Sequence, residues 1–291
     1  MYHSIEGGVC AAAGFKAAGV HVGVKTHAAW KRDVALIVSE VPCAAAGVFT
    51  TNAVKAAPIH ITKAHLSDGK ARAIIANSGN ANACAPDGEE NAERMCAAAA
   101  KAIGCDASEV LVASTGVIGQ KLNVEVIENG VPELFAALEH SAEASDAAAH
   151  AIMTTDTVKK EEAAETVIGG KTVRIGGIAK GSGMIHPNMG TMFCFITTDC
   201  AISVPMLHQA LLTVARRTFN RISVDGDTST NDTFCALANG LAGNPEITAE
   251  GPDYNAFLET LESLCRTLAR KMAKDGEGAK HLITCTVKGA D

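Results

Sequence analysis

Residues Ala179–Thr198 read AKGSGMIHPNMGTMFCFITT, a polar, glycine-rich half followed by an apolar half. The apolar half predicts a buried strand, and Gly190 and Thr191 stand where the loop runs into it. Glycine lets the backbone bend sharply, and the hydroxyl of a following threonine can attack the glycine carbonyl. Cleavage would leave Thr191 with a free α-amine of pKa about 8, which can act as the base for its own hydroxyl. The stretch therefore predicts a self-cleaving nucleophile, and the alternative interpretation is a simple strand start.

Three more polar, glycine-rich segments interrupt the apolar pattern of the chain. They are NSGNANAC (Asn77–Cys84), STGVIG (Ser114–Gly119) and VDGDTSTND (Val224–Asp232). Each adjoins a predicted strand, and loops at strand ends are where folds commonly place function. Any one of them alone could be an ordinary turn. Four such segments in one chain favour a shared site.

Some side chains in these segments suit acyl transfer. Lys180 lies among glycines and a serine, which predicts an exposed anion site but not a phosphate P-loop, because the required GK[ST] order is missing. Thr115 and Gly116 follow a predicted strand, where two backbone N–H groups could bind an oxyanion. Glu277, in DGEGAK after a long predicted helix, is expected to be exposed, and solvation alone would explain it.

The segment VDGDTSTND invites a metal interpretation, because it carries Asp225, Asp227 and Asp232. The calcium-loop pattern of EF-hands fails, since its glycine position is Thr230 and its glutamate position is Ala236. We expect these carboxylates to cap helix N–H groups and to order the loop. No metal site is predicted, although an irregular one stays a rival hypothesis.

The pattern of the whole chain predicts an α/β (α+β) layered sandwich, with sheets covered by helices. β-branched runs alternate with helical stretches rich in alanine, glutamate and leucine. A charged stretch, Val158–Thr166, is expected to be flexible. The predicted strands are Val34–Ser39, Arg72–Asn77, Val110–Ser114, Lys171–Gly176, Phe193–Thr198, Ile222–Val224 and His281–Val287. The predicted helices are Glu89–Ile103, Pro205–Phe219 and Asp253–Lys274.

Composition narrows the class of protein. The formal net charge is −7 and no Lys/Arg block stands out, so nucleic-acid binding has no electrostatic support. Ten cysteines without a C-x-x-C pair fit free thiols in a reducing cytoplasm better than a disulfide scaffold or a structural zinc site. No apolar run is long enough for a membrane helix, so no membrane partner is expected.

Taken together, these motifs resemble the glutamate N-acetyltransferase / ornithine acetyltransferase family of arginine biosynthesis. The resemblance runs from about Gly7 to Lys280. It covers GVFTTN, NSGNANAC, VASTGVIGQ, IMTTDT, AKGSGMIHPNM, RISVDGDTSTNDT and DGEGAK. It implies a layered sandwich similar to, but connected differently from, the N-terminal nucleophile hydrolases. It also implies cleavage before Thr191 into an α chain (residues 1–190) and a β chain that begins at 191, with two copies of each forming a heterotetramer.

The resemblance assigns roles to individual residues. Thr191 would carry the acetyl group from N-acetylornithine to glutamate, with no cofactor, and some family members also take acetyl-CoA as donor. Thr115 and Gly116 would form the oxyanion hole. The substrate-binding residues would be Thr157, Lys180, Thr191 and Glu277. Gly190 departs from the alanine that the family usually has, and glycine still permits cleavage.

The resemblance leaves rival interpretations open. The same self-cut threonine could serve an aminopeptidase or amidohydrolase that uses water as acceptor, or the Asp225–Asp232 loop could belong to a non-catalytic metal-binding module. The family continues beyond the length of this chain. We therefore expect residues 191–291 to be the N-terminal part of the β chain, and the sequence to be either a fragment or an inactive truncated form.

Overall fold

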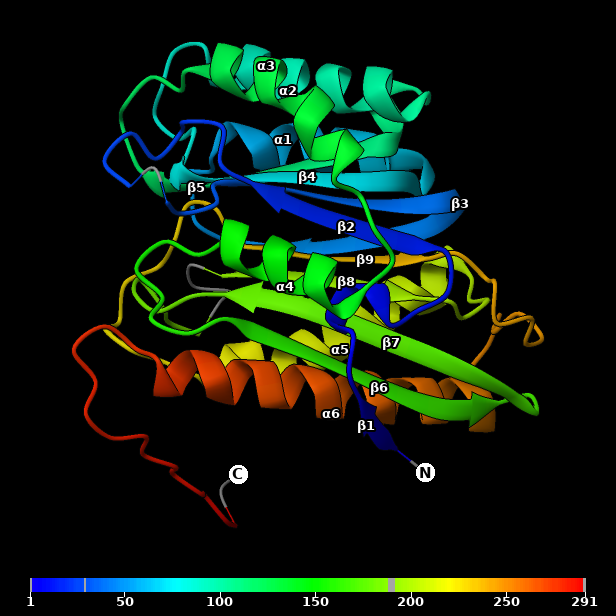
Figure 1. The fold of residues 1–291 in the computed structure, drawn as a ribbon. Helices are drawn as coiled ribbons and strands as arrows, with labels where there is room; N and C mark the ends of the chain where they lie inside the picture. The colour runs from blue at the N-terminus through cyan, green and yellow to red at the C-terminus, as the bar shows by residue number, and fades with distance from the viewer. Residues whose placement is uncertain (1, 29, 188–191, 290–291) are drawn as a thin grey trace.

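The computed structural model describes residues 2–28, 30–187 and 192–289 (Figure 1). Strands alternate with helices along this part of the chain. The strands are β1 (His3–Ile5), β2 (Phe15–Val20), β3 (Val34–Phe49), β4 (Lys70–Asn80), β5 (Val110–Val117), β6 (Lys160–Ile168), β7 (Lys171–Lys180), β8 (Phe193–Thr198) and β9 (Thr233–Ala238). The helices are α1 (Ala57–His65), α2 (Gly88–Ile103), α3 (Val124–Ala136), α4 (Ala142–Ala151), α5 (Val204–Arg217) and α6 (Pro252–Lys274), with short 3-10 turns at Gly8–Cys10, Leu66–Asp68, Ala107–Glu109 and Phe219–Arg221.

One long strand joins two halves of the sheet. The strand order is β1-β6-β7-β8-β9-β3-β4-β5, and β2 pairs with β3 outside this path. The first part of β3 pairs with β2 and β4, whereas its second part, Ala44–Phe49, pairs with β9. The register shifts between Val38 and Cys43, where the strand passes from one half to the other. Only the β4–β5 and β8–β9 pairs are parallel among the described strands.

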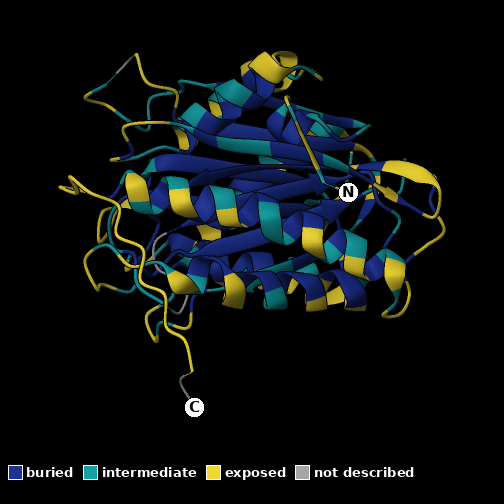
Figure 2. Ribbon diagram, turned by 90° about the horizontal axis from the view of Figure 1, so that it is seen from below, coloured by how far each residue is buried: buried dark blue, intermediate teal, exposed yellow. Residues whose placement is uncertain are grey.

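The two halves stack to form a layered sandwich. Alternate residues of a strand point to opposite faces, so each half has two apolar faces to bury. Ile74 of β4 and Phe195 of β8 share a core between the halves, while Ile75 of β4 faces α2 and α3 and Ile196 of β8 faces α5 and α6. Figure 1 shows α1–α3 on one side of the strands and α5 and α6 on the other, and Figure 2 shows the strands buried beneath partly exposed helices. The predicted layered α/β sandwich is therefore confirmed.

Strands β7 and β8 flank the predicted cleavage point. They pair antiparallel from Ile175 with Thr198 to Lys180 with Phe193, so the intervening segment is the loop at the end of a hairpin. Strand β8 is in turn parallel to β9, and β9 pairs with β3. Both strands that follow the predicted cut thus lie inside the sheet, between β7 and β3.

Among the predicted helices, strands and flexible stretch, several predictions are confirmed and three are wrong. The helices predicted at Glu89–Ile103, Pro205–Phe219 and Asp253–Lys274 match α2, α5 and α6. Ile222–Val224, which follows the 3-10 turn Phe219–Arg221, forms no strand. A single backbone hydrogen bond, from Val224 N to Ile185 O, ties it to the loop after β7, and one such bond does not make a strand ladder. Val158–Thr166 is not flexible, since most of it is β6, paired on both sides. His281–Val287 is described throughout but is exposed and unpaired, and a strand forms only with a hydrogen-bonded neighbour (Figure 2).

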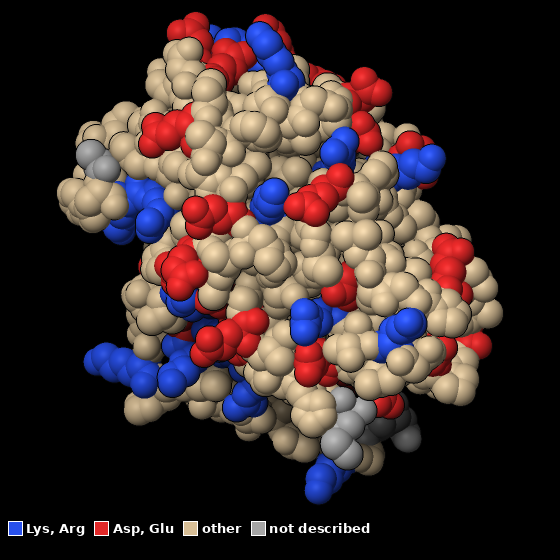
Figure 3. All heavy atoms as spheres, turned by 45° about the vertical axis from the view of Figure 1, so that its right-hand side comes forward, with Lys and Arg blue, Asp and Glu red and all other residues tan. Residues whose placement is uncertain are grey.

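Figure 3 shows acidic and basic side chains interspersed on one face of the protein, so this face is neither uniformly acidic nor uniformly basic. The face in this view therefore offers no basic stripe for a nucleic acid. Among the helices of the described residues, none combines the length and the apolar character needed to cross a lipid bilayer.

Candidate active site

A cavity of about 910 Å³ collects the glycine-rich segments at one end of the strands. Each of the four segments, and the DGEGAK segment, contributes to its wall. The wall also includes two parts that the sequence analysis did not single out: a loop between β2 and β3, and Lys121–Asn123 after β5. The lining residues used below are Lys25, Lys31, Thr115, Gly116, Lys121, Thr154, Thr155, Lys180, Gly183, Asp225, Asp227 and Glu277.

Lys180, the last residue of β7, is the buried cation of this cavity. Its Nζ donates to Thr115 Oγ1 at 3.3 Å, and the backbone N of Gly181 donates to Asp156 Oδ1 at 2.8 Å. Burial lowers the pKa of Lys180, and the nearby carboxylate of Asp156 opposes that shift. The sequence prediction of an exposed site is wrong, because strand pairing carries Lys180 into the interior, where it still borders the cavity.

Thr115 and Gly116 belong to β5 itself, rather than to a turn just past it. Gly116 has a φ of +131°, and a Cβ atom built there would lie 2.3 Å from the carbonyl carbon of Gly79 in β4. Only glycine fits such a close approach of two backbones at this φ. The register between β4 and β5 shifts beside Gly79, and such irregularities often aim backbone or side chains at a site.

Asn231 ties three of the glycine-rich segments together, and the sequence analysis did not identify it. Its buried amide donates to Ala81 O and to Ser114 O, both at 2.6 Å. These acceptors lie in NSGNANAC and at the start of STGVIG, while Asn231 itself lies in VDGDTSTND. The clustering of the segments therefore has a specific buried hydrogen-bond basis.

Asp232 holds the backbone next to the predicted nucleophile. Its Oδ1 accepts from Met192 N at 2.8 Å, and Thr233 N donates to Met192 O at 3.0 Å. Burial raises the pKa of Asp232 well above its usual value. Gly190 and Thr191 lie outside the described residues. Their neighbour Met192 is fixed directly before β8, whose first residue, Phe193, pairs with Lys180 of β7.

The acidic loop orders its surroundings but caps no helix. Asp225 accepts from Met184 N at 2.5 Å and Ile185 N at 3.1 Å, and the loop leads into strand β9. The helix-capping prediction is therefore wrong, because no helix follows, whereas the loop-ordering prediction is confirmed. In residues 2–28, 30–187 and 192–289, no three His, Cys, Asp or Glu side chains gather as metal ligands would.

Glu277 and Thr157 differ in their relation to the cavity. Glu277 lines it beside Gly183, and its backbone N donates to Ser182 O at 2.7 Å. The carboxylate approaches so closely that a Cβ atom on Gly183 would lie 2.6 Å from Glu277 Cδ. Thr154 and Thr155 line the cavity, but Thr157 is not among the lining residues. The hydroxyl of Thr157 donates to Asp275.

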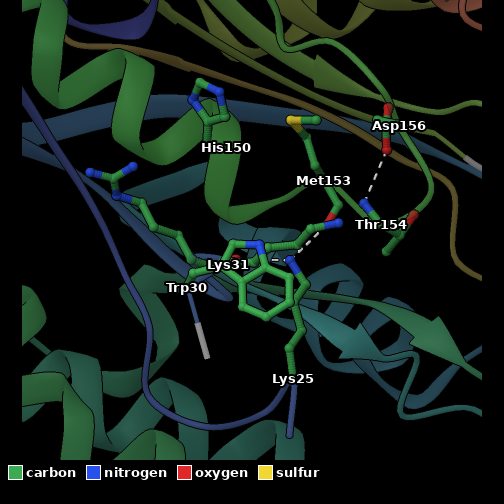
Figure 4. Close-up of a pocket in the computed structure, with 8 residues that line it drawn as sticks. Lys25, Trp30, Lys31, His150, Met153, Thr154 and Asp156 are labelled. Atoms are coloured by element: carbon green, nitrogen blue, oxygen red, sulfur yellow. Dashed lines mark hydrogen bonds between the residues drawn. The ribbon is translucent and has the colours of Figure 1, made fainter. Parts of the chain in front are cut away.

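The loop between β2 and β3 adds cations to the cavity wall. Lys25 Nζ donates to the carbonyl oxygens of Arg32 and Met153, both at 2.8 Å, and burial lowers the pKa of Lys25 to about 8. Figure 4 shows Lys25 and Lys31 beside Trp30 around a smaller adjoining cavity of about 220 Å³. The sequence analysis missed this loop, because its lysines look like those of any solvent-exposed loop.

Comparison with known proteins supplies the family. A family model described as the ArgJ family matches residues 16–291. The arginine biosynthesis bifunctional protein ArgJ of Symbiobacterium thermophilum is 52% identical, over 98% of this chain and 71% of the relative. The protein of the same name from Gloeobacter violaceus is 50% identical, over 98% of this chain and 70% of the relative.

Solved structures agree at the level of the fold. The ArgJ structure from Bacillus halodurans is 42% identical with a TM-score of 0.60, and covers 66% of this chain and 99% of its own. The ornithine acetyltransferase of Mycobacterium tuberculosis, complexed with ornithine, is 40% identical with a TM-score of 0.60, over 66% of this chain and 100% of its own. An L-aminopeptidase D-Ala-esterase/amidase of Ochrobactrum anthropi, with a variant of the Ntn hydrolase fold, has a TM-score of 0.55 at 10% identity, which shows shared fold alone. The chain therefore belongs to the ArgJ family of arginine-biosynthesis enzymes, as its motifs indicated.

Proposed function

We propose that the chain cleaves itself between Gly190 and Thr191 and then transfers acetyl from N-acetylornithine to glutamate. The observation that carries this proposal is the meeting of Thr115, Gly116, Lys180 and Glu277 on one cavity. They come from three separate parts of the chain, and each has a chemical task in acyl transfer.

The pairing of β7 with β8 supports a cut after which the two resulting chains stay together. Residues 1–190 and 191–291 would remain joined after the cut, because β8 and β9 are paired between β7 and β3. The solved ArgJ and ornithine acetyltransferase chains also support a cut, since each is covered almost whole by 66% of this chain. That share of 291 residues is about the length that precedes Thr191. An assembly of two α and two β chains is part of the proposal.

The proposed cleavage step balances as an N-to-O acyl shift followed by hydrolysis. Thr191 Oγ attacks the Gly190 carbonyl carbon, the peptide C–N bond breaks, and the nitrogen takes the hydroxyl proton. Water then cleaves the ester, which leaves a carboxylate on Gly190 and a free hydroxyl and α-amine on Thr191. An α-amine with a pKa of about 8 is largely available as a base near neutral to mildly alkaline pH.

The proposed transfer uses the same hydroxyl twice. The amine of Thr191 takes the hydroxyl proton while Oγ attacks the acetyl carbonyl of N-acetylornithine, and the backbone at Thr115 and Gly116 binds the oxyanion. The C–N bond breaks, the departing ornithine nitrogen takes the proton, and acetyl-Thr191 remains. The amine of glutamate then attacks this ester, which releases N-acetylglutamate and restores Thr191. The steps need neither a metal nor an organic cofactor.

The charges of the cavity fit amino-acid substrates. Lys180 provides a buried cation for a substrate carboxylate, with Lys25 and Lys31 on the same lining. Glu277 provides a carboxylate for the cationic end of ornithine, and Asp225 and Asp227 lie on the same lining. The proposed role of Thr157 requires it to reach substrate from its place beside Asp275. We place the reaction in the cytoplasm, where its substrates would be made.

Product analysis tests the proposed function. Purified protein is incubated with acetyl-labelled N-acetylornithine, with and without glutamate, and labelled N-acetylglutamate and acetate are quantified. We expect N-acetylglutamate only when glutamate is present, and a parallel reaction with acetyl-CoA shows whether that donor is used. Labelled acetate released at the same rate without glutamate would instead support the aminopeptidase or amidohydrolase alternative.

The backbone contact at Gly116 gives a further prediction. Gly116→Ala forces a Cβ atom into the backbone of Gly79, so we expect the free energy of unfolding to fall by about 1–3 kcal/mol or more. Displacement of the oxyanion donors should also lower acetyl transfer by about 100-fold or more. Urea unfolding and the transfer assay measure the two effects. Gly119→Ala is the matched control, because its φ of +78° is strained but its Cβ would meet open space. Equal transfer rates in the two variants would contradict the prediction.

A further inference from the structure

Lys160 is a buried lysine outside the proposed chemistry. It is the first residue of β6 and its side chain is fully buried. The three ammonium protons have three partners: Asp156 Oδ1 at 2.6 Å, Asp275 Oδ2 at 2.6 Å and Val158 O at 3.2 Å. The Asp156 and Asp275 side chains are also buried or nearly so. Such a lysine needs an explanation, because burial of charges is expensive unless every partner is in place.

Each carboxylate bound by Lys160 is joined to a different wall of the cavity. Asp156 accepts from Gly181 N at 2.8 Å, directly after Lys180, and from Thr154 N at 3.1 Å. Asp275 lies at the end of α6, two residues before Glu277. It accepts from Thr157 N at 3.0 Å and from the Thr157 hydroxyl.

Lys160 and Lys180 interact electrostatically with the same carboxylate, that of Asp156. Burial by itself would raise the pKa of Asp156, but Lys180 and Lys160 outweigh it and hold that pKa below its usual value. Asp156 is thus the shared counter-ion of Lys160 and Lys180. Lys160 and Thr157 together hold the pKa of Asp275 below its usual value against burial. Ionised carboxylates at both places are what the hydrogen bonds of the network require.

We propose that Lys160 is a positioning residue that fixes Lys180 and Glu277 at their spacing across the cavity. It acts through Asp156 and Gly181 on one side and through Asp275 on the other, and touches no substrate. The inference rests on the proposed function for the identity of the substrates. It explains why Thr157 lies beside Asp275: the Lys160 network holds that loop against the end of α6.

The test compares Lys160→Met with the matched control Lys271→Met. Lys271 also ties α6 to β6, through Glu162 Oε1 at 2.6 Å and Glu161 O at 2.9 Å, but its side chain is partly exposed and bonds no cavity loop. Hydrogen exchange of the backbone amides is measured for residues 154–158, 181–183 and 275–277, together with kcat and KM for N-acetylornithine. We expect faster exchange in all three loops and about a 100-fold lower kcat/KM, mostly through KM, for Lys160→Met only.

A second variant covers the case in which Lys160→Met does not fold. The double variant Lys160→Met with Asp275→Asn removes the ammonium and one carboxylate charge together, and Asp156 keeps the favourable charge of the nearby Lys180. We expect it to fold and to keep the raised KM. A folded variant, single or double, with the exchange and KM of Lys271→Met would overturn the inference. Hydrogen exchange needs no substrate, so a wild-type protein that transfers no acetyl but shows the expected exchange difference would count against the proposed function alone.

Discussion

Thr191→Ala is expected to remain a single uncut chain of 29.9 kDa and to transfer no measurable acetyl. The substitution removes the hydroxyl that would attack both the Gly190 carbonyl and the acetyl group. Loss of a catalytic nucleophile lowers kcat by about 10⁴-fold or more in enzymes whose catalytic groups act as a unit. Denaturing gels and the N-acetylornithine assay measure the two losses in the same preparation.

Thr191→Ser is the matched control for this prediction. Serine keeps the hydroxyl and the α-amine after cleavage and lacks only a methyl group, so we expect slower but complete cleavage and retained transfer. Circular dichroism should show the same fold for both variants, because β8 and its neighbours do not depend on the hydroxyl. Transfer by the alanine variant would mean that another group carries the acetyl.

Lys180→Met is expected to raise KM for N-acetylornithine by about 30-fold or more. Truncating one partner of a buried charge pair costs about 2–5 kcal/mol, and Lys180 would form such a pair with a substrate carboxylate, because it is buried and its Nζ bonds only Thr115 Oγ1 among the described residues. Methionine keeps the length and apolar body of the side chain, so the change isolates the charge. Steady-state kinetics at fixed salt measures the effect.

The pH dependence of KM provides the check on Lys180. Burial lowers the pKa of Lys180, so its ammonium loses its proton at a lower pH than a free lysine does. A substrate carboxylate is bound below that pKa, and KM should therefore rise as the pH passes upward through it. In Lys180→Met this rise should disappear. Lys101→Met, at an exposed position of α2, is the control and should keep the wild-type profile. An unchanged KM in Lys180→Met would contradict the assigned role.

The sequence predicts the elements that local pattern and packing specify together. The helices α2, α5 and α6 follow from apolar periodicity and from clear end signals such as Gly104, and strand β8 follows from a continuous run of apolar and β-branched residues. Strand β9 was missed because its residues, Thr233–Ala238, form a short buried run with a single β-branched residue, and such a run fits a helix as well as a strand. His281–Val287 has the composition of a strand, but composition cannot supply the neighbouring ladder that a strand needs.

The candidate site was predictable only where its residues carry a local sequence signal. Glycine-rich segments after strands carry a local signal, and the structure brings all four to one cavity. Lys25 carries no such signal, because a lysine in a polar loop is indistinguishable from a solvated one until the fold buries it. The same is true of Asn231 and Lys160, which bond Ser114 and Asp275, respectively, far away in the sequence. Long-range hydrogen bonds and ion pairs are properties of the packed chain.

The intact mass of purified, folded wild-type protein tests the central claim most directly. Cleavage before Thr191 predicts two polypeptides in equal amounts that co-purify, the shorter beginning with threonine at residue 191. Their masses should add up to that of the whole chain plus one water. A folded preparation that contains only the unbroken 29.9 kDa chain would contradict the account.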